Sequence, residues 1–178
     1  MQHIFNTAAI IFVLSSCNSD KKDASHYDCF TSYDEYKGFL PYDFRVIQSS
    51  YAHSGNYVNK MDTAFPYSLN ATGRWGDFTT KQIKEVRGDY WVYPTQTNQS
   101  VFLVCVYEYP GSTQPFYYEF YDAAKSLTKA NEWQFVSTTF YLPDTIDPNL
   151  TFKMFIWNKG VQPAYVDDFG IQFIEKAN

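Results

Sequence analysis

The chain has 178 residues, of which 20% are aromatic, and its 14 basic and 19 acidic side chains give a formal net charge of −5. This length favours one domain, and an acidic balance without a basic stripe argues against a nucleic-acid partner. The 16 tyrosines, 16 phenylalanines and 4 tryptophans offer flat apolar faces that suit half-buried sheets and sugar stacking alike.

The N-terminus has the pattern of a secretory signal. Residues 8–14, AAIIFVL, form an apolar run too short to cross a bilayer. The following LSSC, residues 14–17, resembles a bacterial lipobox, which predicts a signal peptide over 1–16 and a lipidated, palmitate-bearing Cys17. The first seven residues contain no Lys or Arg, so an ordinary signal peptide or a buried strand is the alternative.

Residues 17–26, CNSDKKDASH, are polar and charged and predict a tether between the lipid and a folded domain over 27–178. Acyl chains would hold Cys17 in a membrane, since each buried methylene contributes ~0.8 kcal/mol. We therefore expect a membrane-anchored protein of the cell envelope, with the outer membrane as the favoured location.

Strand signals dominate the remaining chain, because β-branched and aromatic residues recur between turn-forming segments. Only residues 121–133 are compatible with a turn or two of helix. So many strands without a βαβ rhythm predict an all-β fold, an antiparallel β-sandwich or jelly roll. The predicted strands are 44–50, 81–86, 89–94, 101–109, 115–121, 133–142, 151–158 and 164–174.

Two adjacent carboxylates, Asp167 and Asp168, stand inside the last predicted strand, AYVDDFGIQFI. A two-residue period places Asp167 with Phe169 and Ile171 on the core face and leaves Asp168 in solvent. A buried carboxylate needs compensation. A calcium ion, a basic side chain or backbone N–H groups would each provide it.

This strand resembles the closing strand of carbohydrate-binding jelly rolls of the galactose-binding-like superfamily. The segments YDCFTSY at 27–33, SSYAHSG at 49–55, NEWQFVSTTFYLP at 131–143 and TFKMFIWNKG at 151–160 are similar to other parts of that fold. The ensemble resembles small lipoproteins of Gram-negative glycan-degrading bacteria. The resemblance implies a structural calcium ion, for which the matching positions are Asp167, Asp28, Ser54 and Gly55.

Catalytic motifs are missing from the sequence. The Glu-x-Asp-x-x-Glu strand of jelly-roll glucanases does not occur, and Glu119 and Asp122 would face opposite sides of a strand. His53 has no nucleophile motif to serve, so we interpret it as a turn residue. Zinc spacings and phosphate loops are also missing from the sequence. We expect a protein that is not an enzyme.

A glycan-binding protein needs aromatic rings on an accessible face. Trp133 and Trp157 are expected in the core, because apolar residues surround them in their strands. The candidate ligand-binding rings are Trp75, in the polar stretch GRWGDF, and Trp91, Tyr93, Tyr107 and Tyr109. We predict non-catalytic binding of a polysaccharide or oligosaccharide. The alternative is contact with an envelope protein and no sugar ligand.

Two cysteines remain if Cys17 is lipidated. An oxidising compartment would permit a disulfide between Cys29 and Cys105. Two separate buried thiols agree with the sequence equally well.

Overall fold

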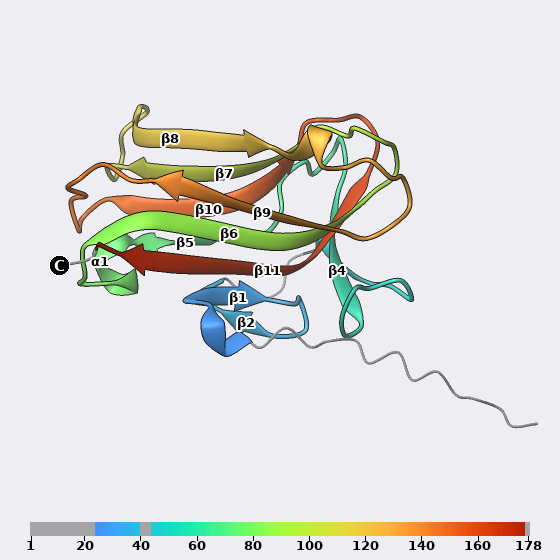
Figure 1. The fold of residues 1–178 in the computed structure, drawn as a ribbon, viewed down its shortest axis with the longest axis horizontal. Helices are drawn as coiled ribbons and strands as arrows, with labels where there is room; N and C mark the ends of the chain where they lie inside the picture. Colours follow the sequence, from blue (N-terminus) through green and yellow to red (C-terminus); the bar gives the residue numbers. More distant parts are fainter. Residues whose placement is uncertain (1–23, 40–43, 177–178) are drawn as a thin grey trace, which may run out of the picture.

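The computed structural model describes residues 24–39 and 44–176. Two antiparallel sheets pack face to face in this range (Figure 1), which confirms the predicted all-β sandwich. The predicted signal peptide, Cys17 and the first part of the tether lie outside the described residues, so lipidation remains a prediction. The end of the predicted tether forms a short 3-10 helix, η1 (Ala24–His26).

The larger sheet has seven strands in the described chain. Its central strand, β11 (Ala164–Glu175), pairs along one side with β6 (Ile83–Pro94), and β6 pairs in turn with the edge strand β9 (Gln134–Tyr141). The other side of β11 is shared by β4 (Tyr57–Met61) and β1 (Cys29–Thr31). Two short outer strands complete the sheet, β3 (Val46–Gln48) beside β4 and β2 (Tyr36–Lys37) beside β1.

The smaller sheet has the order β5 (Ala71–Arg74), β10 (Thr151–Asn158), β7 (Val101–Glu108) and β8 (Pro115–Asp122). A single helical turn, α1 (Trp75–Phe78), follows β5, and a 3-10 turn, η2 (Ala123–Lys125), follows β8. The helical region predicted at 121–133 is therefore limited to η2 within the part described. Both helical turns therefore belong to short connections between strands.

The predicted strands at 81–86 and 89–94 form the single strand β6. Gly88 lies in its middle, where a Cβ atom would stand only 2.4 Å from the Leu103 side chain of the facing sheet. The glycine therefore marks a close approach between the two sheets and not a turn.

The core lies between the sheets and follows the expected two-residue alternation in β10, where Phe152, Met154 and Ile156 are fully buried. Cys29 and Cys105 are separate buried free thiols, one in each sheet, and they form no disulfide with each other. Burial raises the pKa of the Cys29 thiol to about 12, which makes it unreactive.

Candidate functional site

A β-bulge interrupts β11 at the two aspartates. Asp168 and Phe169 together stand opposite a single residue of β6, Tyr90. Asp168 adopts φ = +47°, a left-handed conformation that is unfavourable for residues with a side chain. The extra residue shifts the inward–outward alternation of the strand by one position. Val166 and Phe169 therefore both point into the core, although they are three positions apart. The expectation that Asp167 shares the core face with Phe169 is therefore wrong, since Asp167 points to the outer side of the sheet.

Both carboxylates are nevertheless buried, because the loop at 49–56 covers them. Asp167 accepts hydrogen bonds from the backbone N–H groups of Ser54 (3.0 Å) and Asp168 (2.8 Å). Asp168 accepts a hydrogen bond from Ser54 Oγ at 2.6 Å and lies 2.7 Å from His53 Nδ1. The expectation that Asp168 is solvated is wrong, because only 4% of it is exposed. The two side chains fasten the loop to the bulge.

The environment of Asp167 and Asp168 disfavours a negative charge on both carboxyl groups at once. Burial raises the pKa of Asp167 to about 8, the adjacent Asp168 adds to the shift, and the N–H groups around Asp167 oppose it. Two neighbouring carboxylates in a dry environment disfavour the second ionisation. His53 gives Asp168 a side-chain partner at 2.7 Å, which Asp167 lacks among the described residues.

Seven rings gather above the bulge on the outer face of the seven-stranded sheet, and we call them the aromatic platform. They come from the covering loop, from β6, from the start of β9 and from β11. Its members are Tyr51, His53, Trp91, Tyr93, Trp133, Phe135 and Tyr165.

The loop contributes two rings that lie over the strand rings. His53 stacks on Trp91 with centroids 4.0 Å apart and planes 18° from parallel, and Tyr51 stacks on Tyr93 at 5.5 Å and 29°. The Trp133 indole N–H donates to the Tyr51 backbone oxygen at 2.9 Å. Because Asp168 also holds His53, the bulge and the rings above it form one connected unit.

Ring faces remain accessible on this platform. Tyr51 is 43% exposed and Phe135 41% exposed, while the other members are half-buried. Half-buried rings in an ordered cluster can bind a flat apolar ligand face without a large ordering penalty.

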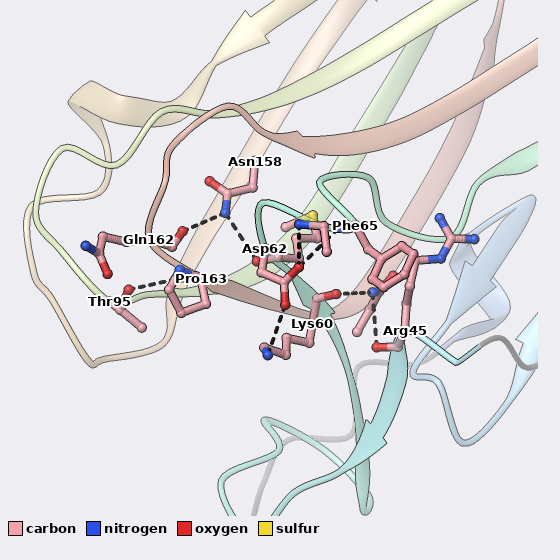
Figure 2. A network of polar contacts seen from close by, with 11 residues as sticks. Arg45, Lys60, Asp62, Phe65, Thr95, Asn158, Gln162 and Pro163 are labelled. Atoms are coloured by element: carbon pink, nitrogen blue, oxygen red, sulfur yellow. Dashed lines mark hydrogen bonds and ion pairs between the residues drawn. The ribbon is translucent and has the colours of Figure 1, made fainter.

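Polar groups border the platform beside Tyr165. Lys60 of β4 is the cross-strand neighbour of Tyr165 and forms a 3.0 Å ion pair with Asp62. Asp62 also accepts from the Phe65 backbone N–H (Figure 2). A hydrogen bond with Tyr51 and partial burial raise the pKa of the Tyr165 hydroxyl to about 12. The border therefore offers hydroxyl, ammonium and carboxylate groups for orienting a polar ligand.

A buried polar network fixes the loops at this end of the sandwich. Asn158, which is 2% exposed, donates its side-chain amide to the backbone oxygens of Gln162 and Met61 (Figure 2). The Thr95 hydroxyl donates to the Pro163 backbone oxygen at 2.7 Å. Satisfied buried networks of this kind rigidify the structure around them, which holds the start of β11 and its Tyr165 in place.

The predicted ligand-binding rings separate into two groups. Trp91 and Tyr93 lie in the platform. Trp75 and Tyr107 do not offer a free face, because they are 4% and 0% exposed and pack together at 5.1 Å in the core. The interpretation of GRWGDF as an exposed polar loop is wrong, since α1 turns Trp75 inward over the end of the sandwich. Tyr109 is 47% exposed, but it lies at the end of β7 in the other sheet, beside Phe116.

The expected core positions of Trp133 and Trp157 are also wrong. Trp133 belongs to the platform, where it contacts His53 and Tyr93. Trp157 packs against Phe102 on the outer face of the four-stranded sheet. We call that second surface the apolar face and define it by Phe102, Val104, Val106, Phe116, Tyr118, Phe120, Phe155 and Trp157.

Of the residues expected to hold calcium, Ser54 lies beside Asp167, whereas Asp28 lies beside Phe173. The Asp167 oxygens already accept two N–H groups, and Asp28 instead accepts from the Phe173 backbone N–H further along β11. In residues 24–39 and 44–176, no three or more His, Cys, Asp and Glu side chains are grouped to hold a metal. Calcium prefers six to eight oxygen ligands, backbone oxygens among them, so calcium binding stays a prediction. What the structure shows at Asp167 is compensation by backbone N–H groups.

Five platform members were not predicted from the sequence. Trp133 and Phe135 alternate outward just as Trp91 and Tyr93 do, and this two-residue pattern was visible in the sequence. Tyr51 and His53 had no such signal, because their positions depend on contacts with residues more than a hundred positions away, at Asp168 and its neighbours.

Ser54, His53 and Asp168 do not form a nucleophile–base arrangement. The Ser54 hydroxyl donates to Asp168 and not to His53, whereas a serine nucleophile needs the imidazole as its hydrogen-bond partner. The contacts in this loop therefore agree with a holding role for the aspartates and a stacking role for His53.

Comparisons with known proteins concern the fold. No protein-family model and no curated protein matches the sequence. The structure is similar to the CBM22-1 xylan-binding domain from Paenibacillus barcinonensis, with a TM-score of 0.53 and 11% identity over 85% of this chain and 96% of that chain.

Two further similarities are weaker. A Family 16 carbohydrate-binding module has a TM-score of 0.47 and 11% identity over 75% of this chain and 89% of that chain. A putative sugar binding protein from Bacteroides thetaiotaomicron has a TM-score of 0.49 and 8% identity over 72% of this chain and 80% of that chain.

Within the described residues, no helix has the length and apolar character needed to span a membrane. The fold is a β-sandwich of the carbohydrate-binding-module type, as the sequence resemblance implied.

Proposed function

We propose that the protein binds a glycan without catalysis and that the aromatic platform is its binding surface. The observation that carries this proposal is the stack of His53 on Trp91, held from below by the buried Asp168. Sugar rings present C–H faces that pack on aromatic side chains, and their hydroxyl groups need oriented polar partners. The platform and its Lys60–Asp62 border supply both within one ordered surface.

Charge pairing at the border favours an uncharged glycan. Lys60 pairs with Asp62, and Lys129 pairs with Glu132 at 2.8 Å next to Trp133. Each cation is therefore compensated by a carboxylate on the protein itself. An acidic polysaccharide would have to compete with these ion pairs, whereas a neutral chain would leave them intact.

The proposal is tested by affinity electrophoresis of the chain in gels that contain neutral polysaccharides, with xylan among them. We expect retardation of the wild-type chain and loss of most of it in Trp91→Ala. A nucleic-acid base that stacks on one aromatic ring contributes about 1–3 kcal/mol, and a sugar face packs on the same kind of ring. Trp157→Ala is the matched control, since it removes a half-buried outer-face tryptophan from the other sheet. Equal retardation of both variants would contradict the proposal.

The lipoprotein prediction adds an anchor to this function. Lipidation of Cys17 would display the domain at the cell envelope, and the outer membrane stays the proposed location. Mass spectrometry of the mature N-terminus, compared with a Cys17→Ala variant, tests the anchor directly. An unmodified thiol at Cys17 in the membrane fraction would contradict it.

The alternative function, contact with an envelope protein and no sugar ligand, would draw on the apolar face. Phe116, Tyr118 and Phe120 alternate along β8 and are 44%, 45% and 56% exposed. A wild-type chain that no neutral polysaccharide retards would favour this alternative. Retardation that depends on Trp91 but not on Trp157 would favour glycan binding.

A further inference from the structure

A groove opens between the edge strands of the two sheets, away from the aromatic platform. In the described chain β8 pairs only with β7, and β9 pairs only with β6, so the two strands face each other across the open side of the sandwich. The groove between them has a volume of about 310 Å³. This lies at the lower end of the range for small-ligand sites. We call it the edge groove.

The edge groove contains a carboxylate at a position where a sandwich normally has an apolar side chain. Glu119 is the cross-strand partner of Cys105, a fully buried core residue, and therefore lies on the inner face of β8, where the open side of the sandwich leaves it exposed to solvent. On the opposite strand Thr138 stands between the buried Val136 and Phe140. Polar residues at inward positions of both edges leave the side of the sandwich open to polar ligands.

Glu119 has no partner among the described residues. In residues 24–39 and 44–176 it forms no ion pair, and no donor hydrogen-bonds to its carboxylate. The side chains that line the edge groove include no Lys, Arg or His. An acidic side chain among aromatic rings with no cation beside it attracts a positively charged ligand.

Two tyrosine rings flank this carboxylate. Tyr117 and Tyr121 stand two positions before and after Glu119, about 7 Å away along the strand. The Tyr117 hydroxyl donates to the Tyr141 backbone oxygen across the edge groove at 3.1 Å, and the Tyr121 hydroxyl lies 3.3 Å from Ser126 Oγ. Both tyrosine hydroxyls already have partners. A ligand in the edge groove would therefore contact the two ring faces and the Glu119 carboxylate.

The wall behind the edge groove contains an unusual polar atom. Tyr107 is fully buried, its ring contacts the Tyr117 ring at 5.9 Å, and its hydroxyl has no hydrogen-bond partner in the described chain. Burial raises the pKa of Tyr107 far above its ordinary value, so the hydroxyl is neutral. Buried hydroxyls without a partner are rare and usually have a functional or solvent explanation.

We propose that the edge groove binds an alkylammonium group, either a protonated primary amine or a quaternary ammonium. Glu119 is its counter-ion, and the rings of Tyr117 and Tyr121 contact the carbon atoms next to the nitrogen. Aromatic rings combined with one carboxylate are the usual protein environment for such groups. The ligand is either a small free amine or an amino sugar, and the site is separate from the platform.

The test is calorimetric titration of the full chain with choline and with 3,3-dimethylbutanol, a neutral compound of the same shape. We expect choline to bind about tenfold more tightly than the neutral compound, the difference that one charge-assisted contact supplies. Glu119→Gln should remove this preference, whereas Glu175→Gln, which changes a distant exposed carboxylate, should preserve it. Glucosamine and N-acetylglucosamine form a second pair, and a preference for glucosamine alone identifies the amino sugar as the ligand.

The proposal is overturned if neither amine binds better than its neutral counterpart, or if Glu119→Gln retains the preference. Trp91→Ala should leave amine binding unchanged, since it alters the platform only. A loss of amine binding in Trp91→Ala would also overturn the separation of the two sites, while glycan binding is judged independently in the polysaccharide gels.

Discussion

The outer faces of the two sheets are both rich in aromatic residues, yet they are held in different ways. On the seven-stranded sheet a loop places Tyr51 and His53 over the strand rings, and the contacts of His53 and Ser54 with the buried Asp168 carboxylate hold that loop. On the four-stranded sheet the rings cover Val104 and one another, and Val104 is fully buried as in a small core.

This difference is the reason why we propose the platform, and not the apolar face, as the ligand surface. Rings that cover buried aliphatic residues contribute to stability by removing apolar area from water. Rings that a buried polar network holds in place are already ordered in the free protein. A ligand that binds them therefore loses less free energy to the ordering of side chains. Aromatic content alone does not distinguish the two cases, whereas the polar contacts beneath the rings do.

The largest expected effect comes from Asp168→Ala. The change leaves His53 and Ser54 without their acceptor and places an alanine at φ = +47°. We expect the free energy of unfolding to fall by about 2–4 kcal/mol, measured by urea denaturation. Asp168→Gly removes the backbone strain and should lose about 1 kcal/mol less than Asp168→Ala.

The matching change on the other sheet is Glu108→Gln, which breaks the Glu108–Lys153 pair at the end of the apolar face. Both side chains are partly exposed, so the loss should stay below about 1 kcal/mol. Equal losses in Asp168→Ala and Glu108→Gln would remove the distinction between the two faces.

A smaller effect is expected from His53→Ala. The imidazole is partly exposed, so the free energy of unfolding should fall by only about 1 kcal/mol. The affinity for a retained glycan should fall about tenfold, because the ring stacked on Trp91 is lost. Phe120→Ala, on the apolar face, should leave the affinity unchanged, and a similar loss there would place the ligand on the wrong sheet for this account.

The pH dependence of stability should reveal the buried carboxyl of Asp167. Its pKa rises from about 3.9 in an unfolded chain to about 8 in the fold. Its contribution is therefore complete at pH values below the unfolded pKa and is lost as the pH rises through about 8. We expect Asp167→Asn to flatten the fall in melting temperature between pH 4 and pH 8.

Asp62 provides the control with the opposite sign. Hydrogen bonds from Lys60 and from the backbone lower the pKa of Asp62, so its contribution is lost as the pH falls. Asp62→Asn should therefore leave the decline toward alkaline pH in place. A decline that persists undiminished in Asp167→Asn would show that another group causes it.

The smallest expected effect is that of a chelator. Since the Asp167 oxygens already accept N–H groups, EDTA should shift the melting temperature by less than the error of a thermal melt. A drop that calcium alone reverses would show that the carboxylates exchange these donors for an ion.

Regular alternation made much of this fold predictable from the sequence. The inward face of β10 and the outward rings Trp91 and Tyr93 both follow from a two-residue period. The same two-residue period gave the wrong face for Asp167. The bulge adds one residue to β11, and the alternation of residue types in the sequence does not reveal it.

Tertiary contacts decided the remaining positions. Trp75 looked exposed because its neighbours in sequence are polar, but the helical turn α1 directs it against Phe152 and Phe173. The loop at 49–56 has no regular pattern, and its role depends on a pairing with β11 that spans more than a hundred residues. The strands of the platform could therefore be predicted from the sequence, whereas the loop that completes it could not.

The central claim is that a glycan binds on the platform, and the four tryptophans allow a direct measurement. Trp91 and Trp133 belong to the platform, Trp157 to the apolar face and Trp75 to the core. Their indole N–H signals can be followed by NMR during titration with an oligosaccharide from a polysaccharide that retards the chain. The account predicts that the Trp91 and Trp133 signals shift together while those of Trp75 and Trp157 stay in place. Movement of the Trp157 signal, with Trp91 and Trp133 unchanged, would contradict it.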